Sequence, residues 1–288
     1  MDKKRKASIS VIIPFYSHAD WLEEALDSVL SQTLPADEII VINDGSKEDL
    51  LELIEKYKDS VRFLQQENKG AAAARNFGIE SASGEIVAFL DSDDLWEPNK
   101  LEVQIGEMEK NSYMWSASGY KTFGWGKSEY IRPYCSKNLC WEHLYNTTRI
   151  ATPAVIVYRE ALEKNRFAVD MKNGQDTFLW YKLANLYRLG VIDEPLVRVR
   201  KRKNSTYRNT EIWIKTRAIL WEKMSVTCEL IQPRRLLTKM AYYIAAFVYK
   251  RNKGSKSNLI EKLLFVVSWG LFKLDDFLLE MKEPDIIG

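Results

Sequence analysis

The stretch EIVAFLDSDD, residues 85–94, decides the fold, because an apolar run in it ends directly in a cluster of acidic residues. The apolar part, Glu85 to Leu90, predicts a short buried strand. A second run, EIIVI at residues 38–42, leads in the same way into the polar turn NDGS at residues 43–46. Ligands of open α/β sheets bind outside the carboxyl ends of the strands. We therefore expect both polar clusters to face one cleft.

The segments around these two runs alternate between strand and helix patterns. The first predicted strand begins at Ser8 and is ended by Pro14. Asp20 and Glu23 form a candidate capping box for the next helix, whose apolar face includes Trp21. The alternation predicts an α/β fold with a mainly parallel sheet flanked by helices. Further strands are expected at 61–64, 114–123, 154–158 and 191–199, and helices at 20–30, 50–57, 71–79 and 176–189.

Two residues mark features near the end of this alternating region. Gly190 is expected to stop the helix at 176–189, and Pro195 suggests an edge or a kink in the strand that follows. After about Tyr207 the pattern is helical to the end of the chain. We therefore divide the chain into an α/β domain, residues 1–206, and a C-terminal helical region, residues 207–288.

The function of the C-terminal helices has three open interpretations. They can pack on the α/β domain, lie on a membrane surface through their basic flanks, or join copies of the chain into a homo-oligomer. Packing is the default. No apolar run approaches the roughly 20 residues of a membrane span, so we expect a cytoplasmic protein. Peripheral contact with the inner face of the cell membrane is the alternative that these helices leave open.

Composition excludes some functions. The 288 residues carry a formal net charge of +2, which is too small to indicate binding of nucleic acid. Cys135, Cys140 and Cys228 lack the spacing of a metal site, and a zinc site is not expected. The chain is long enough for one α/β domain and a smaller appendage.

The acidic triplet at residues 91–93 carries the most specific chemistry. Asp91 and Asp93 follow a predicted strand and can share a divalent cation and a ribose. Mg²⁺ and Mn²⁺ prefer oxygen ligands, and Mg²⁺ commonly takes one or two carboxylates together with substrate phosphates. The alternative is a solvated acidic turn before the helix that starts near Pro98.

Three other polar residues are candidates for the same cleft. Asp44 follows a strand and can accept the N3–H of uracil, although Asp-Gly also favours a plain turn. Arg75 lies in an Ala-rich helix and can reach a base or a phosphate; otherwise it is a surface arginine. Asp176 opens a helix, where it can serve as a cap or as a catalytic base.

Taken together, these motifs resemble the family 2 glycosyltransferases of bacterial surface-polysaccharide synthesis, which have the GT-A fold of nucleotide-diphospho-sugar transferases. The resemblance runs from Ser8 to about Ser205, so residues 1–206 would form the GT-A catalytic domain. Each motif is weak alone, and their order and spacing are specific. The motifs are VIIP at 11–14, NDGS at 43–46, NKG at 68–70 with ARN at 74–76, DSDD at 91–94, and QD at 175–176 before Trp180.

The resemblance implies a role for each site residue. Asp44 would hold uracil, Asp91 would touch the ribose and Asp93 would bind Mn²⁺ or Mg²⁺. Asp176 would remove the acceptor proton in an inverting single displacement, in which a nucleotide-diphosphate sugar, most simply a UDP-sugar, gives its sugar to a hydroxyl. The acceptor would be a surface glycan or its lipid-linked precursor. The donor-binding set would be Pro14, Tyr16, Asp44, Asn68, Gly70, Arg75, Asp91, Ser92 and Arg202.

The chain also departs from the family pattern. The Glu-Asp pair common in the family is Gln175-Asp176 here. The histidine that often follows the final strand is absent, and the basic stretch at 198–203 takes its place. We infer that a cation such as Arg202 contacts the diphosphate; a solvated basic strand end is the alternative.

Two other functions fit the sequence less well than sugar transfer. A sugar nucleotidyltransferase needs a Gly-rich loop after the first strand, and the loop at residues 15–18 has no glycine. A non-catalytic nucleotide-sugar binding or scaffold protein would not need every acidic residue that is present here. For the wall beside the transferred sugar, Trp115, Tyr120 and Trp125 are the candidates, and the sugar itself is not readable from the sequence.

Overall fold

The computed structural model describes residues 7–133 and 150–203, together with Thr216, Ile219, Leu220 and Lys223. The helices predicted beyond Tyr207 and the three cysteines lie outside the described residues, apart from those four positions. Among the described helices, none has the length and apolar character needed to cross a bilayer.

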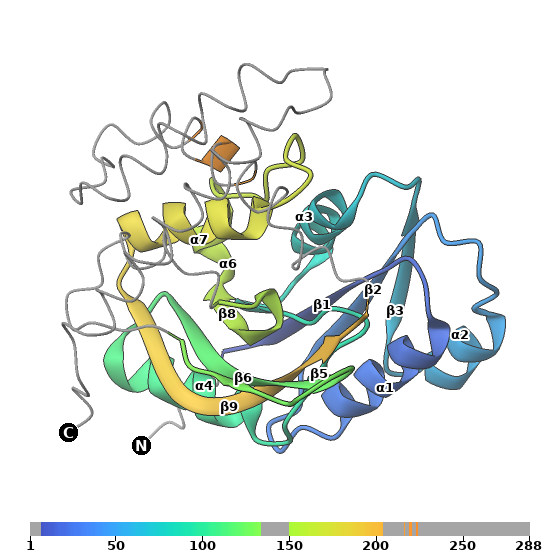
Figure 1. Cartoon of the computed structure of the whole chain (residues 1–288), viewed down its shortest axis with the longest axis horizontal. Coiled ribbons are helices and arrows are strands. Elements are labelled where there is room, and N and C mark those ends of the chain that lie inside the picture. Colours follow the sequence, from blue (N-terminus) through green and yellow to red (C-terminus); the bar gives the residue numbers. More distant parts are fainter. Residues whose placement is uncertain (1–6, 134–149, 204–215, 217–218, 221–222, 224–288) are drawn as a thin grey trace, which may run out of the picture.

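A single nine-stranded sheet organises the described chain, in the order β3-β2-β1-β4-β8-β6-β9-β5, with β7 paired to β6 (Figure 1). Strands β1 to β4 are parallel to one another. Strand β8 is antiparallel to β4 and β6, and β5 is antiparallel to β9. The strands are β1 (Ile9–Phe15), β2 (Glu38–Asp44), β3 (Arg62–Gln66), β4 (Ile86–Phe89), β5 (Leu95–Trp96), β6 (Trp115–Gly124), β7 (Tyr130–Ile131), β8 (Val155–Tyr158) and β9 (Leu189–Lys201).

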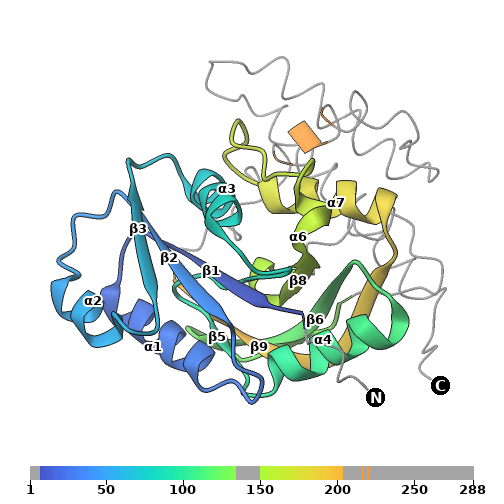
Figure 2. The ribbon, with the colours of Figure 1, turned by 180° about the vertical axis from the view of Figure 1, so that it is seen from behind.

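Helices cover both faces of this sheet, as Figures 1 and 2 show from opposite sides. Helix α3 (Ala71–Ser81) and helix α7 (Gln175–Leu186) contribute to one apolar layer, which we call the α7 face. Helices α1 (Ala19–Leu30), α2 (Leu51–Tyr57) and α4 (Lys100–Asn111) contribute to the layer on the other side, the α4 face. The short helices η1 (Thr152–Ala154) and α6 (Arg159–Leu162) flank β8.

The α/β architecture predicted from the sequence is therefore present, and the sheet is mixed rather than parallel throughout. The strands of the N-terminal half, where strand and helix patterns alternate most regularly, are all parallel, and the other half combines the parallel pair β6 and β9 with antiparallel pairs. Pro14 does not end the first strand, because it still pairs with Ile42 of β2. Gly190 does not stop α7 either, because that helix ends at Leu186 and Gly190 pairs with Ser116 inside the sheet.

The capping box predicted for α1 is not formed. His18 precedes the helix in the left-handed conformation, with φ of 69°, and neither Asp20 nor Glu23 caps it. The Glu48 carboxylate accepts the N–H groups of His18 and Ala19 instead, at 2.7 and 2.8 Å. An acidic group at a helix N-terminus is favourable wherever it lies in the sequence, and here it comes from the loop after β2.

Strand β9 contains the kink that Pro195 suggested, and it is not an edge strand. It lies between β6 and β5, and its register against β6 shifts around Gly119. Pro195 pairs with Gly119 at that shift, where a missing N–H removes no regular ladder bond. The shift matters for function, because it changes which side chains of β9 face each side of the sheet.

Candidate functional site

The acidic loop at residues 91–94 follows β4 and is fixed to β9. Asp94 is buried, with 4% of its surface exposed, and its carboxylate accepts the backbone N–H of Arg200 at 2.7 Å. Burial is the main reason why the pKa of Asp94 lies well above its usual range, and the charges of Asp93 and Asp91 act in the same direction. Strand β5 continues from this loop and pairs with β9. The loop that follows β4 is therefore fixed to the C-terminal end of β9.

Asp93 presents its carboxylate at the surface of this loop. Its side chain is 19% exposed, and its Oδ2 atom contacts the guanidinium of Arg202. Burial raises the pKa of Asp93, the charge of Asp91 raises it further, and Arg202 opposes both. A second carboxylate nearby and partial desolvation both favour a bound cation, and Arg202, just beyond the end of β9, supplies one.

Asp91 is paired to the neighbouring helix instead. The guanidinium of Arg75 in α3 donates to its Oδ1 at 2.5 Å. The Arg75 side chain is 7% exposed, and its guanidinium lies 5.3 Å from the ring centroid of Phe167. Its Nε atom is buried and has no hydrogen-bond partner among the described residues. Arg75 is therefore a buried cation that ties α3 to the acidic loop, and not the surface arginine of the alternative interpretation.

Asp44, the last residue of β2, is bonded to the turn that precedes α3. Its Oδ1 accepts hydrogen bonds from Gln66 at 2.7 Å and from the N–H of Lys69 at 2.9 Å, and its Oδ2 accepts the N–H of Gly70 at 2.9 Å. The side chain is buried, with 4% exposed. Each carboxylate oxygen accepts two hydrogen bonds, so Oδ2 keeps capacity for one more donor. The turn role and the base-binding role are therefore compatible.

Two glycines let this turn form. Gly45 has φ of 72°, and a Cβ atom there would lie 2.7 Å from the backbone nitrogen of Asn68. Gly70 has φ of 87°, with open space around the position of a Cβ atom. The close approach at Gly45 places Asn68, which is exposed, directly beside the turn that follows β2. The residues predicted to bind the sugar donor after β2 and before α3 thus lie together.

Asp176 lies in the first turn of α7, after Gly174 in the left-handed conformation. Its Oδ1 accepts the N–H of Thr177 at 2.7 Å, and its Oδ2 is 3.4 Å from the hydroxyl of Thr152. Thr152 comes shortly before β8, whose residue Ile156 pairs with Ala88 near the end of β4. The first turn of α7 therefore lies at the same sheet edge as the acidic loop.

A second contact supports that placement. The indole N–H of Trp96, which follows the acidic loop, donates to the carbonyl of Pro153 at 3.0 Å. Residues 152–154 thus contact the acidic-loop segment on one side and Asp176 on the other. Between them and Asp44 lies β1, where Pro14 is buried and Tyr16, just beyond the strand, is 53% exposed. Ser92 is half-buried in the acidic loop.

The three residues predicted for the wall beside the transferred sugar differ in their exposure. Trp115 is fully buried and stacks on Trp180 of α7, with 6.0 Å between ring centroids, so it belongs to the core and cannot line an open site. Tyr120 is 9% exposed on the α4 face. Trp125 is 44% exposed at the tip of the β6–β7 hairpin. Only Trp125 keeps the exposure that a wall residue needs.

Arg200 and Trp21 are parts of the site that the sequence analysis missed. Arg200 donates through Nε to the carbonyl of Asp93 at 2.9 Å and pairs with Glu24 at 2.7 Å. Trp21 was assigned to the apolar face of a helix, yet it stacks on His18, and the guanidiniums of Arg200 and Arg202 lie 4.9 and 5.0 Å from its ring centroid. The signal was the arginine at every second position, 198, 200 and 202, which in a strand lie on one face.

The donor atoms suit a hard cation that a substrate helps to hold. Within residues 7–133 and 150–203, histidine, cysteine and acidic side chains do not gather in groups of three or more around a point that a metal could occupy. Mg²⁺ is commonly held by one or two carboxylates plus substrate phosphates rather than by an all-protein cage. The partly exposed Asp93 carboxylate, with Asp91 and Asp94 nearby, fits that pattern.

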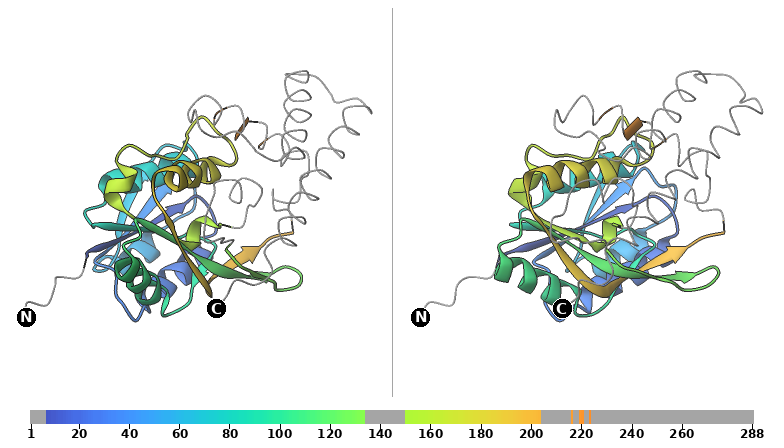
Figure 3. Two further views of the ribbon diagram at one scale, coloured as in Figure 1. Left: turned by 90° about the vertical axis from the view of Figure 1, so that its left-hand side faces the viewer. Right: turned by 60° about the vertical axis from the view of Figure 1, so that its left-hand side comes forward.

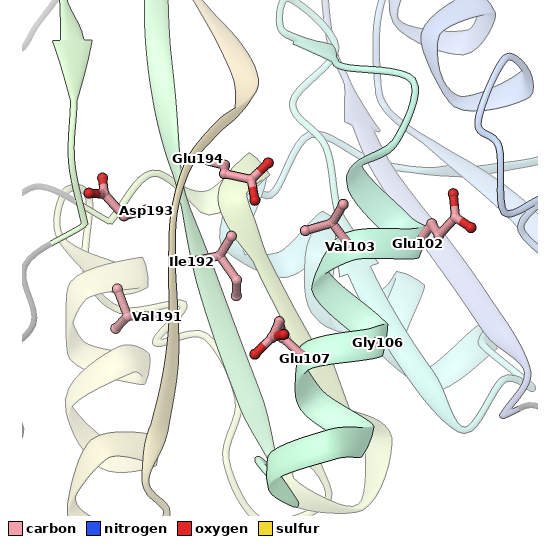
Figure 4. Close-up of a pocket in the computed structure, with 8 residues that line it drawn as sticks. All are labelled: Glu102, Val103, Gly106, Glu107, Val191, Ile192, Asp193 and Glu194. Carbon is pink, nitrogen blue, oxygen red and sulfur yellow. The ribbon is translucent and has the colours of Figure 1, made fainter. Parts of the chain in front are cut away.

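A surface pocket of about 480 Å³ lies elsewhere, between α4 and β9 (Figure 4). Four of its lining residues are acidic: Glu102, Glu107, Asp193 and Glu194. Figure 4 shows Glu107 and Glu194 on opposite sides of the gap between the two elements. Such a pocket repels a diphosphate, so we do not assign the donor to it.

The fold and the acidic sheet edge together define the class of GT-A-type nucleotide-sugar transferases, and comparison with solved structures agrees. Staphylococcus aureus TarS, residues 1–349 in complex with UDP-GlcNAc, superposes with a TM-score of 0.67 at 21% identity, over 92% of this chain and 80% of that one. The mannosyltransferase PcManGT from Pyrobaculum calidifontis, in complex with GDP-Man and Mn²⁺, gives a TM-score of 0.57. At this identity, the likeness establishes the fold alone.

The chain belongs to glycosyl transferase family 2, whose family model matches residues 10–167, more than half of the sequence. An uncharacterized glycosyltransferase of Rickettsia bellii is 37% identical over 71% of this chain, and the match spans only 30% of that longer relative. The Bacillus subtilis protein TuaG, a putative teichuronic acid biosynthesis glycosyltransferase, is 34% identical over 62% of this chain and 72% of its own. Escherichia coli WfgD, a UDP-Glc:alpha-D-GlcNAc-diphosphoundecaprenol beta-1,3-glucosyltransferase, is 31% identical over 64% and 73%.

Proposed function

We propose that the chain transfers a sugar from a UDP-sugar to a hydroxyl of a glycan or lipid-linked acceptor, with inversion at the anomeric carbon. One observation carries the proposal: the acidic loop after β4 is bonded on one side to Arg75 of α3, and on the other to Arg200 of β9 and to Arg202 just beyond that strand. The UDP-GlcNAc bound to TarS and the UDP-Glc specificity in the name of WfgD support uridine as the base. WfgD also motivates a lipid-linked acceptor.

Each side chain has a role that follows from its place. Asp44 would accept the uracil N3–H through the remaining capacity of Oδ2, beside Asn68 and Gly70. Asp91, oriented by Arg75, would accept a ribose hydroxyl. These groups are fixed by hydrogen bonds and ion pairs before the donor arrives, so little rotamer freedom is lost when it binds.

Asp176 would take the proton of the acceptor hydroxyl. Its carboxylate is held by the N–H of Thr177 and lies near the Thr152 hydroxyl, and this limits its orientation at the start of α7. In-line attack then needs the acceptor on the α7 side and the departing diphosphate on the side of Asp93 and Arg202. Positioning of this kind can lower a barrier by about 7–11 kcal/mol.

Arg202 would exchange partners during the reaction. Its side chain is 46% exposed, so it can leave Asp93 more easily than the buried Arg75 can leave Asp91. A divalent ion bound by Asp93 would act as a Lewis acid that neutralises the diphosphate as it departs. Arg202, released from Asp93, would then donate to the diphosphate oxygens.

Binding of Mn²⁺ and of UDP, measured separately by calorimetry, tests this assignment. For Asp93→Asn we expect UDP affinity to fall about 10–100-fold when Mn²⁺ is present, with a small change in its absence. For Arg202→Gln we expect tighter binding of Mn²⁺ alone, because a competing cation is gone, and weaker binding of UDP with Mn²⁺. Arg198→Gln, which removes an arginine that does not contact Asp93, is the matched control for both measurements.

A panel of UDP-, GDP- and dTDP-sugars, assayed for slow hydrolysis with and without Mn²⁺, identifies the donor. Hydrolysis of a UDP-sugar that requires the metal supports the proposal. If no nucleotide sugar is bound or hydrolysed, transferase activity is refuted. Tight donor binding without turnover across a broad acceptor panel would favour the non-catalytic binding protein. Unchanged Mn²⁺ dependence in Asp93→Asn would remove that residue from the metal site.

A further inference from the structure

The outer parts of β6, β7 and β9 carry a row of cations and aromatic rings, and apart from Arg200 the proposed reaction does not use them. Lys121 of β6 pairs with Tyr130 of β7 on one side and with Arg198 of β9 on the other. Phe123 of β6 pairs with Arg200 of β9. We call the face formed by Lys121, Phe123, Tyr130, Arg198 and Arg200 the ribbon face.

The register shift in the sheet decides which way this face points. Tyr120 and Val197 belong to the apolar layer of the α4 face. Side chains alternate along a strand, so Lys121 and Arg198 project toward the opposite side, the α7 face. Asp176 lies in the first turn of α7. Figure 3 shows the hairpin of β6 and β7 projecting from the body together with the end of β9.

Contacts within the ribbon face hold the rings and cations together. The guanidiniums of Arg198 and Arg200 lie 4.8 and 4.5 Å from the ring centroid of Phe123. Tyr130 is 36% exposed, and Lys121 and Arg198 are exposed. The surface therefore offers aromatic area and positive charge side by side, within the width of three strands.

Three of the carboxylates near this face are already paired with other groups, and a fourth, Glu194, lies near Tyr130. Glu129 pairs with Lys201 at 3.3 Å, and Glu24 pairs with Arg200. Asp193 accepts the Tyr130 hydroxyl at 2.6 Å and lies 3.5 Å from Arg132. Among the described ion pairs, none contains Lys121 or Arg198. These two cations therefore give the face a positive charge that the described carboxylates leave uncompensated.

The ribbon face is continuous with the transfer site. Arg200, its innermost cation, donates through Nε to the Asp93 carbonyl and through its backbone N–H to the Asp94 carboxylate. Two residues further along, Arg202 contacts the Asp93 carboxylate. A chain-like ligand that lies on the ribbon face would thus have one end close to Asp93, at the sheet edge that also carries Asp176, where the acceptor hydroxyl is needed.

We propose that the ribbon face binds the acceptor, and that the acceptor is a saccharide chain bearing phosphate or carboxylate groups. Lysine and arginine would pair with its charges, and the rings of Phe123 and Tyr130 would pack against the apolar faces of its sugars. This inference rests on the proposed function for the position of the reacting end. A narrow face that leads into the transfer site fits an extended chain better than a flat membrane surface.

Fluorescence anisotropy with labelled oligosaccharides tests the proposal on the full chain. The probes are a polygalacturonate hexasaccharide, which carries carboxylates, and maltohexaose, which is uncharged and of equal length. We expect the charged probe to bind at least about tenfold more tightly than the neutral one, and Lys121→Gln/Arg198→Gln to remove about that factor. Phe123→Leu, which keeps the charge, should weaken the charged probe by a smaller factor, about two- to fivefold.

The matched control is Lys58→Gln/Lys110→Gln, which removes two exposed cations from α2 and α4. Equal loss in this control would reduce the effect to net charge and overturn the proposal. So would unchanged binding in Lys121→Gln/Arg198→Gln. If that double variant instead lost only binding to vesicles of one part phosphatidylglycerol and three parts phosphatidylcholine, the face would be a membrane contact.

Measurement of UDP affinity for the same variants separates the two proposals. The ribbon-face variants should bind UDP as the unchanged chain does, because neither side chain touches the acidic loop. A chain that binds the charged oligosaccharide but no nucleotide sugar would refute the proposed function and leave the ribbon face as a glycan site. A chain that binds a nucleotide sugar but does not bind the charged oligosaccharide more tightly than the neutral one would refute the ribbon-face proposal alone.

Discussion

The two halves of the sheet hold their functional groups in different ways. In the half formed by β3, β2, β1 and β4, Asp44 is buried and bonded to two backbone N–H groups and to Gln66. In the half formed by β8, β6, β9 and β5, Asp93 contacts the exposed side chain of Arg202, and the side-chain neighbours of the Asp176 carboxylate are two threonine hydroxyls, each at 3.4 Å. The first arrangement is set before a ligand binds, and the second can exchange partners.

This difference matches what the two halves are proposed to do. A uridine that is the same in every donor can be recognised by a rigid turn. A transfer site must instead accept a diphosphate, release it and admit an acceptor, so exchangeable ion pairs on its surface are an advantage. Surface ion pairs contribute only about 0–1 kcal/mol each, which keeps such exchanges inexpensive.

The largest expected effect lies in the half of the sheet whose ion pairs can exchange partners. Asp176→Asn keeps the size of the side chain and removes the base, so we expect turnover to fall about 10²–10⁴-fold while UDP affinity stays the same. The measurements are initial rates with the identified donor and calorimetry with UDP. Asp170→Asn, an exposed aspartate paired with Lys223, is the control and should keep its activity. Turnover near that of the unchanged chain would remove Asp176 from the role of base.

The next effect tests how firmly the fixed half is held. Arg75→Met leaves Asp91 without its partner and uncovers the Phe167 ring, so we expect a loss of about 3 kcal/mol in the free energy of unfolding. Urea denaturation measures it. Arg62→Met is the matched control, because Arg62 is 53% exposed and lies 4.0 Å from Glu38. Its loss should stay below about 1 kcal/mol. Equal losses in the two variants would contradict a special role for the buried pair.

A pair of glycine variants isolates the turn around Asp44. Both Gly45 and Gly70 have positive φ, so alanine should cost each of them about 1 kcal/mol of stability. Only at Gly45 does the new Cβ meet backbone, the Asn68 nitrogen at 2.7 Å. Gly45→Ala should therefore lower stability more, and weaken UDP binding more, than Gly70→Ala does. Thermal melts and UDP calorimetry on both variants distinguish backbone strain from the steric clash with Asn68.

The smallest effect concerns Lys100, which is fully buried under Trp96 in the α4 layer. Its ammonium lies 4.2 Å from the Trp96 ring centroid and has no hydrogen-bond partner among the described residues. Burial lowers the pKa of Lys100 well below its usual range. The folded state thus binds the proton less well than the unfolded state, and this cost is full at low pH and fades as pH rises toward about 10.4.

Lys100→Met should therefore stabilise the protein by about 1 kcal/mol at neutral pH, because it removes a buried unsatisfied donor. The gain should shrink as the pH approaches 10. Chemical denaturation of both proteins between pH 6 and about pH 10 measures it. A constant difference across this range would mean that the proton on Lys100 does not differ between the folded and unfolded states.

Much of the half formed by β3, β2, β1 and β4 could be predicted from the sequence, since its strands are continuous apolar runs that end in polar turns. The alternation of residues 8–90 gave the parallel strands, and the strand ends gave Asp44 and the acidic loop as members of one edge. The second half was less predictable. Trp115 was expected in the sugar wall, yet it is a core residue, because a tryptophan in a strand has the same sequence pattern whichever side it faces.

The sequence by itself determined the α/β class, the family resemblance and the chemical types available at the sheet edge, because these depend on local pattern and on residues a few positions apart. Only the tertiary structure decided which charges meet: Arg75 with Asp91, Arg202 with Asp93, and Glu48 with the start of α1. It also decided which side of β9 carries Arg198. The physical reason is that long-range pairing and a register shift at Gly119 fix these neighbours, and local periodicity contains neither.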